Sequence, residues 1–162
     1  MNHPNYTLEQ LKAEPHYSYS AFNSYLNICQ LQYFYRYLEK REPEQTPVAL
    51  PFGSAFHAAL TELAHAVKQS RPLVVDELTD AFATYFKSNC DSSTKVVFKK
   101  EDTRDDLIAT ARQMLEVVTK DWIDSQNIEA LALPFKVELP GLSKPLIGEI
   151  DMVVSEECPF NE

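Results

Sequence analysis

Lys144–Ser155 has the sequence KPLIGEIDMVVS, and the rest of the chain is best interpreted from it. Its large apolar residues predict a β-strand that is buried on most of both faces; they are Leu146, Ile147, Ile150, Met152, Val153 and Val154. Asp151 lies within this apolar run, and Gly148 precedes it by three residues. A buried carboxylate is costly unless a positive group meets it, so we expect a metal ion at Asp151.

A second strand is expected just before this one, so that the two form a hairpin. Residues 129–139 (EALALPFKVEL) are rich in β-compatible residues, and a turn with proline and glycine over 140–143 separates them from 146–155. Glu138 occupies an alternating position of the first strand, where it either faces solvent or joins a metal site. Two strands cannot cover themselves, so more sheet is expected from sequence beyond Glu162.

Helical periodicity dominates everything before the hairpin. Apolar residues recur every three or four positions, which predicts amphipathic helices in a single α/β domain. The expected parts are an arm over 1–17 with a helical turn after Thr7, a helical part over 18–125 and the hairpin over 129–155. Within the helical part we expect a helix over 19–40 capped by Ser18 or Ser20, a proline-containing linker over 41–51, helices over 52–69 and 74–87, a polar loop over 88–100 and a long helix over 102–125.

Composition limits where this protein can act. No apolar run approaches the roughly 20 residues of a membrane-spanning helix, and the N-terminus lacks the basic-then-apolar order of a signal peptide. The three cysteines, Cys29, Cys90 and Cys158, are odd in number and widely spaced, which argues against a disulfide framework. We therefore expect a cytoplasmic protein without a membrane partner.

The net charge of −9 does not favour binding to nucleic acid, because phosphates are bound through Lys and Arg. A local basic face can still exist. Lys95, Lys99 and Lys100 are candidate contacts to DNA phosphates, although a solvated loop explains them equally well. Arg36 stands among the tyrosines of the first long helix, which either stack on single-stranded bases or divide between core and rim.

Three motifs together point to a known family. They are the stretch from SYSAF (18–22) to YFYRYL (33–38), FGSAFH (52–57) and GEIDMV (148–153). In this order they resemble the RecB-like exonuclease branch of the PD-(D/E)XK nucleases, over almost the whole chain. The resemblance implies an α/β nuclease fold represented by its helical N-terminal half and the first two strands of a mixed sheet. It also implies metal-dependent, exonucleolytic hydrolysis of DNA in recombination, repair or phage DNA processing, with a helicase or recombination protein as a further partner.

The resemblance also suggests roles for single residues. His57 corresponds to the metal-proximal histidine of the family, and Gly53 would let its helix approach the sheet. Asp151 corresponds to the first metal-binding carboxylate, in a strand motif that begins at Gly148. The implied cofactor is Mg²⁺ or Mn²⁺, of which Mn²⁺ accepts imidazole more readily. Cys29 sits where iron–sulfur members place a cluster ligand, but the further cysteines do not match, so we expect a buried structural thiol and no cluster.

Two family motifs, D/E-x-K and a following Q-x-x-x-Y-type helix motif, are not found here. A D/E-x-K sequence, whose acid binds metal and whose lysine activates the attacking water, does not occur among the 162 residues. We therefore expect the N-terminal part of a longer nuclease domain, or a short relative that has lost activity, and little or no cleavage by this chain alone. Two alternatives remain open: a non-catalytic acidic helical module that binds a protein, and an inactive nuclease-fold subunit that binds DNA without cutting it.

Overall fold

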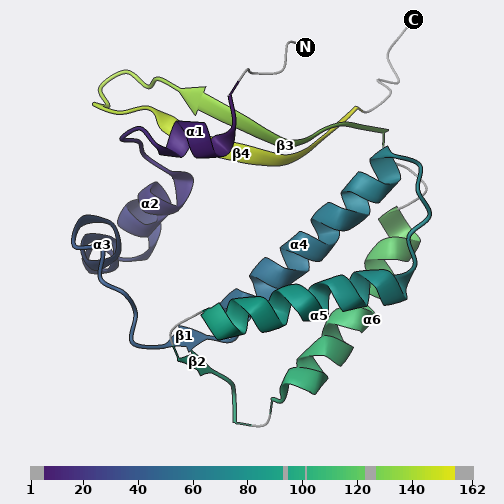
Figure 1. The fold of residues 1–162 in the computed structure, drawn as a ribbon. Helices are drawn as coiled ribbons and strands as arrows, with labels where there is room; N and C mark the ends of the chain where they lie inside the picture. The colour runs from purple at the N-terminus through teal and green to yellow at the C-terminus, as the bar shows by residue number, and fades with distance from the viewer. Residues whose placement is uncertain (1–5, 93–94, 101, 123–126, 156–162) are drawn as a thin grey trace, which may run out of the picture. The chain divides into compact units, whose positions relative to one another are not determined.

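The computed structural model describes residues 6–92, 95–100, 102–122 and 127–155. Helices come first and a two-stranded hairpin comes last, which confirms the expected α/β class (Figure 1). The chain divides into two compact units, which are described separately below. The hairpin unit comprises Met1–Glu42 and Ala130–Val153, and the helical unit comprises Pro43–Glu129 and Val154–Glu162. That the whole chain is one domain stays a prediction.

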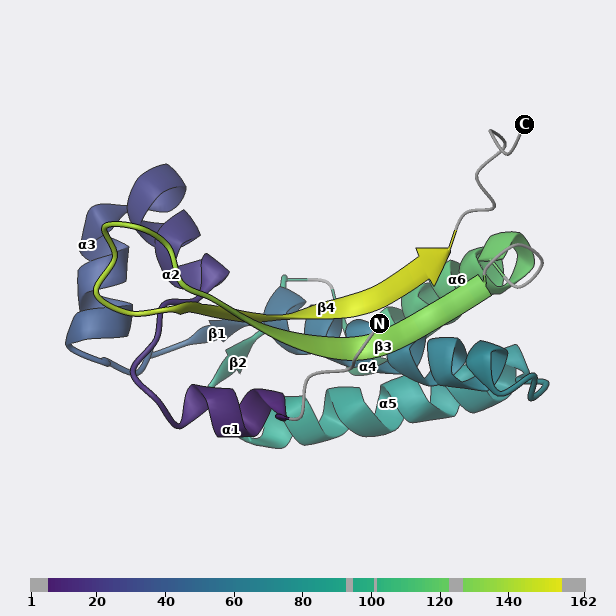
Figure 2. The ribbon, with the colours of Figure 1, turned by 90° about the horizontal axis from the view of Figure 1, so that it is seen from above.

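Three long helices build the helical unit. They are α4 (Ala49–Lys68), α5 (Val75–Ser92) and α6 (Arg104–Trp122), and α5 packs against both of the others (Figures 1 and 2). Their apolar stripes meet in one core, whose fully buried members are Ala55, Ala59, Leu63, Leu78, Phe82, Phe86, Ala111 and Leu115. This confirms the periodicity expected for these segments. None of the described helices has the length and hydrophobicity that crossing a bilayer requires.

The ends of the helices differ from the expected ones for local reasons. Helix α4 begins before Phe52 because Pro51 lies in its first turn, where no backbone N–H is needed. Helix α5 continues to Ser92, because Cys90 is buried and extends the stripe of Phe82 and Phe86 by one turn. The polar loop expected over 88–100 is therefore shorter than predicted.

Two very short strands connect distant parts of the helical unit. β1 (Thr46–Pro47) pairs in parallel with β2 (Val96–Val97). The N–H of Thr46 donates to the carbonyl of Lys95 at 3.0 Å, and the N–H of Val48 donates to the carbonyl of Val97 at 3.0 Å. This pairing places the lysine-containing loop beside the start of α4, which the sequence did not suggest.

Most of the two predicted strands lies in the hairpin unit. β3 (Asn127–Val137) is hydrogen-bonded to β4 (Leu146–Ser155), and the two run in opposite directions (Figure 2). The predicted turn after Thr7 is the helix α1 (Leu8–Lys12), and Thr7 caps it. Tyr17 forms a parallel bridge to Leu146, in which its N–H donates to the carbonyl of Pro145 at 2.9 Å. The N-terminal arm is thus anchored to the start of β4.

The single helix expected over 19–40 is wrong. The structure has α2 (Tyr19–Asn23), the π-helix η1 (Ser24–Ile28), α3 (Gln30–Tyr33) and the π-helix η2 (Phe34–Leu38). Ser18 caps the first of these, as expected. The break falls at Cys29, whose backbone is extended at φ −163° and ψ 120°, after residues of low helix propensity. The Cys29 side chain is exposed, so the expectation of a buried thiol is also wrong.

The burial expected for β4 is wrong as well. Ile147 is buried, but Ile150 is 43% exposed and Val154 is 38% exposed. The reason is that the described sheet has two strands, and two strands leave much of their surface uncovered. Asp151 is itself exposed. Its burial therefore no longer supports a metal ion, and that assignment depends on its motif.

Candidate functional site

His57 lies on the exposed side of α4, in the helical unit. Gly53, one helical turn earlier, is exposed on the same side, whereas Ala55 and Ala59 are buried in the core. The hydroxyl of Thr61 donates to the carbonyl oxygen of His57 at 3.0 Å, which ties the next turn of the helix to this residue. The amphipathic pattern of α4 thus turns the imidazole away from the core.

Gly53 and Gly148 occupy very different surroundings. A Cβ built at Gly53 meets no atom of the described residues within 4 Å, so no steric demand for glycine is visible there. A Cβ built at Gly148 would lie 2.5 Å from Cζ and 2.7 Å from Cε1 of Phe135. The ring of Phe135 on β3 thus covers the backbone of β4, three residues before Asp151. The close approach of α4 to the sheet that was expected at Gly53 involves both units and stays a prediction.

Asp151 lies in the middle of β4, in the hairpin unit, with Glu149 exposed two residues before it. Glu138 follows the end of β3, on the turn side of the hairpin, and is exposed. It lies close enough to Lys136 to help raise the pKa of that lysine, although the larger cause is the hydrogen bond from Lys136 to Glu14. The position of Glu138 gives no specific support for a role beside Asp151.

A metal ion would need donors from both units. Among the residues that the structure describes, no three His, Cys, Asp or Glu side chains form a group that could hold an ion. His57 and Asp151 belong to different units, so their convergence stays a prediction. One carboxylate and one imidazole suit Mn²⁺ better than Mg²⁺, and water and substrate phosphate commonly complete such a shell. By donor chemistry the two residues fit a weak divalent site.

Lys95 and a pocket with hydroxyl groups lie near the start of α4. Lys95, Lys99 and Lys100 flank β2 and are exposed, and the β1–β2 pairing holds this loop beside Val48. His57 follows Val48 by nine residues, or roughly 14 Å along the helix axis. A pocket of about 240 Å³ lies here, and its lining includes the polar residues Thr46, Ser54, Asn89 and Ser92. Sequence reasoning missed this arrangement, because strands of two residues leave no recognisable pattern.

Arg104 and Arg36 have different surroundings from these lysines. Arg104 forms an ion pair with Asp91 at 3.3 Å, so it is less suited to bind phosphate than the lysines. Arg36 belongs to the hairpin unit, and its guanidinium lies 5.6 Å from the ring centroid of Tyr37. Arg36 and the three lysines, which were expected to contact DNA, therefore lie in different units.

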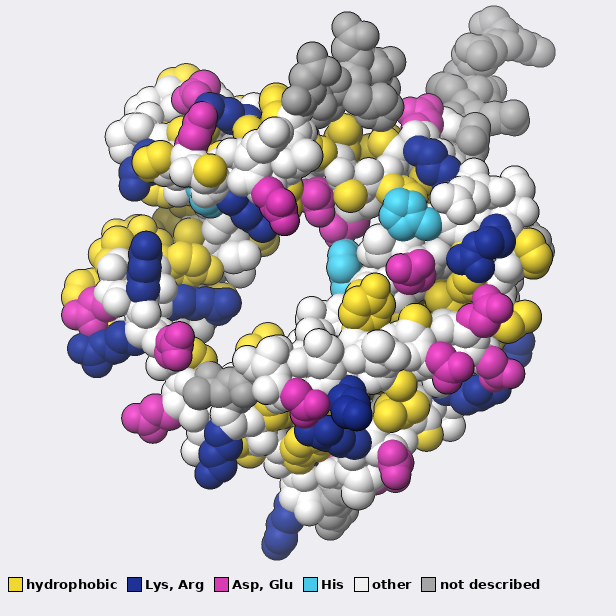
Figure 3. All heavy atoms as spheres, viewed as in Figure 1, with side chains coloured by type: hydrophobic (Ala, Val, Ile, Leu, Met, Phe, Trp, Pro, Cys, Tyr) yellow, Lys and Arg dark blue, Asp and Glu magenta, His cyan; other side chains and the backbone are white. Residues whose placement is uncertain are grey.

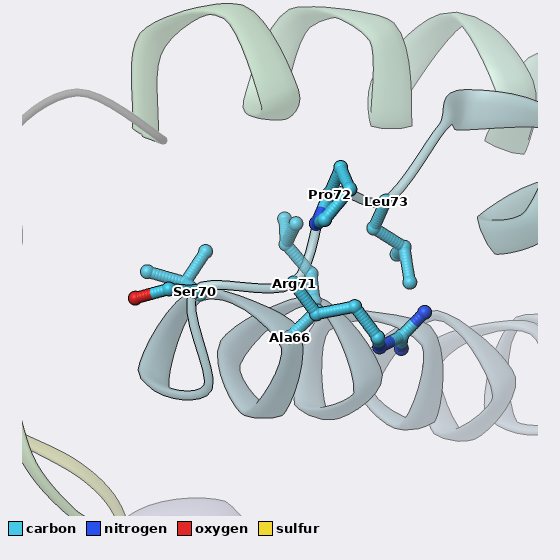
Figure 4. A pocket seen from close by; sticks show the side chains of 7 residues that line it. Ala66, Ser70, Arg71, Pro72 and Leu73 are labelled. Carbon is cyan, nitrogen blue, oxygen red and sulfur yellow. The ribbon is translucent and has the colours of Figure 1, made fainter.

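A larger pocket lies at the other end of α4, and it does not resemble a metal site. It has a volume of about 510 Å³ and is lined by Leu63, Ala66, Val67, Ser70, Arg71, Pro72 and Leu73 (Figure 4). Ser70 ends the helix with φ at 52°, and the N–H of Arg71 donates to the carbonyl of Ala66 at 2.9 Å, as in a Schellman motif. The described lining contains no carboxylate that could bind a metal ion. We therefore interpret this pocket as a result of the way α4 ends, without a binding role.

The family model of the PD-(D/E)XK nuclease superfamily matches residues 16–158. The match includes the α4 histidine, the β4 aspartate and most of both units. The chain therefore belongs to the PD-(D/E)XK nuclease superfamily, whose members are generally hydrolytic nucleases that use divalent metals. Comparisons with curated proteins and with solved structures found no significant match.

Proposed function

We propose that this chain provides the metal-binding histidine and first carboxylate of a DNA nuclease of the RecB-like exonuclease branch. The superfamily match over residues 16–158 is the main support. Within it, Gly53 and His57 stand one turn apart on the exposed side of α4, and Asp151 follows Gly148 on β4 in the G-x-I-D pattern. On this proposal the protein acts in the cytoplasm in recombination, repair or phage DNA processing, beside a helicase or recombination protein.

In this proposal, two side chains bind the metal ion and three lysines bind the DNA backbone. Asp151 supplies a carboxylate oxygen and His57 an imidazole nitrogen to one Mn²⁺ or Mg²⁺. When bound, such an ion neutralises charge on the scissile phosphate and makes water more acidic. Lys95, Lys99 and Lys100 attract neighbouring phosphates of the DNA backbone, and the hydroxyl-lined pocket at the start of α4 offers further contacts to them.

A second function is favoured by the missing D/E-x-K sequence. Without it, the lysine that would activate water is not among the 162 residues. This absence is expected in a nuclease-fold subunit that binds DNA without cutting it. We therefore expect the chain alone to bind a cation and DNA but to show little or no cleavage.

Calorimetric titration with Mn²⁺ tests the proposed metal site. We expect binding heat from the native chain and its loss in both Asp151→Ala and His57→Ala. Two matched controls are available: Glu149→Ala removes an exposed acid from the same strand, and His65→Ala removes an exposed histidine from the same helix. Both controls should keep the heat. Absence of heat from the native chain, or equal loss in the controls, would refute the metal site.

Incubation with labelled single- and double-stranded DNA and Mn²⁺ then separates the two functions. Strong cleavage that Asp151→Ala abolishes would show that the chain is a competent nuclease and that the expected inactivity is wrong. Salt-dependent DNA binding that survives Asp151→Ala, with no cleavage by the native chain, would favour the inactive subunit.

A further inference from the structure

The segment from α2 to η2 exposes large apolar side chains instead of burying them. Tyr19 is 73% exposed, Leu26 69% and Leu38 60%. The same segment exposes Tyr25, Ile28, Leu31, Phe34 and Tyr35. Large apolar side chains that are exposed together in one segment often mark a binding site.

This surface lacks the acids that are common elsewhere in the chain. The sequence has 24 Asp and Glu in 162 residues, yet none lies between Glu14 and Glu39. Three cations, Arg36, Lys40 and Arg41, stand at the end of the segment, and Arg41 forms an ion pair with the neighbouring Glu39. In Figure 3, the part that Figure 1 labels α2 and α3 shows yellow, white and dark blue spheres, with some magenta beside the dark blue. The surface therefore suits a partner that carries both apolar rings and negative charge.

Several of the rings are held in place by neighbouring groups. The Arg41 guanidinium lies 4.5 Å from the ring centroid of Tyr35. The rings of Tyr33 and Tyr37 stack at 5.4 Å with 27° between their planes, and the ring of Tyr25 meets that of Tyr33 edge-on at 5.3 Å. Rings that are fixed by neighbouring groups need little ordering when a base stacks on them, and the exposed Arg36 and Lys40 can attract the adjoining phosphate.

From these observations we propose that the tyrosine face binds single-stranded nucleic acid by stacking unpaired bases. The tyrosine face is defined as the exposed rings of Tyr19, Tyr25, Phe34 and Tyr35 together with Arg36 and Arg41. It selects single strands because the bases of a duplex are already stacked on each other and present only their edges. This inference rests on the proposed function for the identity of the polymer, and it specifies the strand type.

Fluorescence anisotropy with a labelled oligo-dT tests the tyrosine face, and EDTA in the buffer removes any contribution from a metal ion. A duplex of equal length and an oligonucleotide with abasic positions should each bind at least tenfold more weakly than oligo-dT. Tyr25→Ala and Tyr35→Ala should each weaken oligo-dT binding at least fivefold, whereas Tyr35→Phe should keep it. Val74→Ala and Val117→Ala, at exposed aliphatic positions of the helical unit, should stay within twofold.

Other occupants of the face would give different results. Equal affinity for abasic and normal oligonucleotides would overturn the proposal, as would binding that is insensitive to the tyrosine variants. Self-association in sedimentation that is abolished by Leu26→Ala, without oligonucleotide binding, would assign the face to a second copy of the chain. Asp151→Ala should not change the binding in EDTA, so failure of the metal site and failure of the tyrosine face are distinguishable.

Discussion

At the scale of single residues, the two glycines of the motifs have different physical roles. Gly148 lies under the Phe135 ring, where any side chain would collide. Gly53 lies in the first half of α4 with open space at its Cβ position among the described residues. Glycine in an open helical position lowers stability, because it loses more backbone freedom on folding than alanine does. Its presence there is consistent with a functional demand.

Alanine substitutions at these two positions should therefore have opposite effects. Gly148→Ala should lower the free energy of unfolding by about 1–3 kcal/mol through overpacking. Gly53→Ala should raise it by about 0.5–1 kcal/mol. Urea denaturation measures both changes. In a double-mutant cycle, Phe135→Leu should relieve part of the cost of Gly148→Ala, and strictly additive effects would show that the ring contact is not the cause.

At the scale of elements, side-chain caps define where helices begin. At the start of α6, the N–H and hydroxyl of Thr103 donate to Asp106 Oδ2 at 3.1 and 2.6 Å, and the N–H of Asp106 donates back to Thr103 Oγ1 at 3.1 Å. These bonds from Thr103 lower the pKa of Asp106 below its ordinary value of 3.8. A carboxyl with a lowered pKa stabilises the folded state above its unfolded pKa and loses that effect as the pH falls through the folded value.

The start of α6 should consequently weaken in acid. As the pH falls below about 3.8, the native chain should lose the stability that the ionised Asp106 carboxylate contributes. The Asp106→Asn variant lacks this contribution at every pH, so the free energies of unfolding of the two proteins should converge in acid. Asp105→Asn is the control for loss of a negative charge in the same turn. Thr103→Ala should cost about 1 kcal/mol at neutral pH. Curves that stay parallel down to pH 2, measured by urea denaturation, would exclude the cap as the cause.

At the scale of the whole molecule, the two units bury very different amounts of apolar surface. The helical unit has a core that includes Leu63, Phe82 and Phe86 at 1% exposure or less. In the described hairpin unit, by contrast, the buried residues are few and mostly small; they are Leu11, Ala21, Ser24, Ala130 and Ile147. Local stability follows buried apolar contacts, so the two units should open with different free energies.

Hydrogen exchange should make this difference visible. Amides in the middle of α4 and α5 should be the most protected, and amides from α2 to η2 should exchange first. Phe82→Ala should lower the stability of the helical unit by about 3–5 kcal/mol and accelerate its exchange. Tyr85→Ala, at an exposed position of the same helix, is the control. Uniform protection along the chain would mean that the units do not differ in stability.

Several features could be predicted because they depend on local pattern. Helices α4 and α6, the hairpin and the Ser18 cap follow from residue periodicity and turn chemistry, which neighbouring residues determine. The helix expected over 19–40 failed for a related reason. Its apolar spacing is regular, but spacing does not reveal that the backbone at Cys29 is extended. Nor does it reveal that most of the large apolar side chains of this segment stay exposed.

The sequence alone indicated the PD-(D/E)XK superfamily through three motifs in a fixed order, and the family model over residues 16–158 confirmed it. The sequence also shows that no D/E-x-K occurs among the 162 residues. The tertiary structure decided which apolar residues are covered, since burial depends on what packs against a strand or helix. It left Asp151 and the tyrosine face exposed, and it placed Lys95 beside the start of α4 through a strand pair too short to recognise. Contacts between segments far apart in the chain determine these features, so a local sequence pattern cannot predict them.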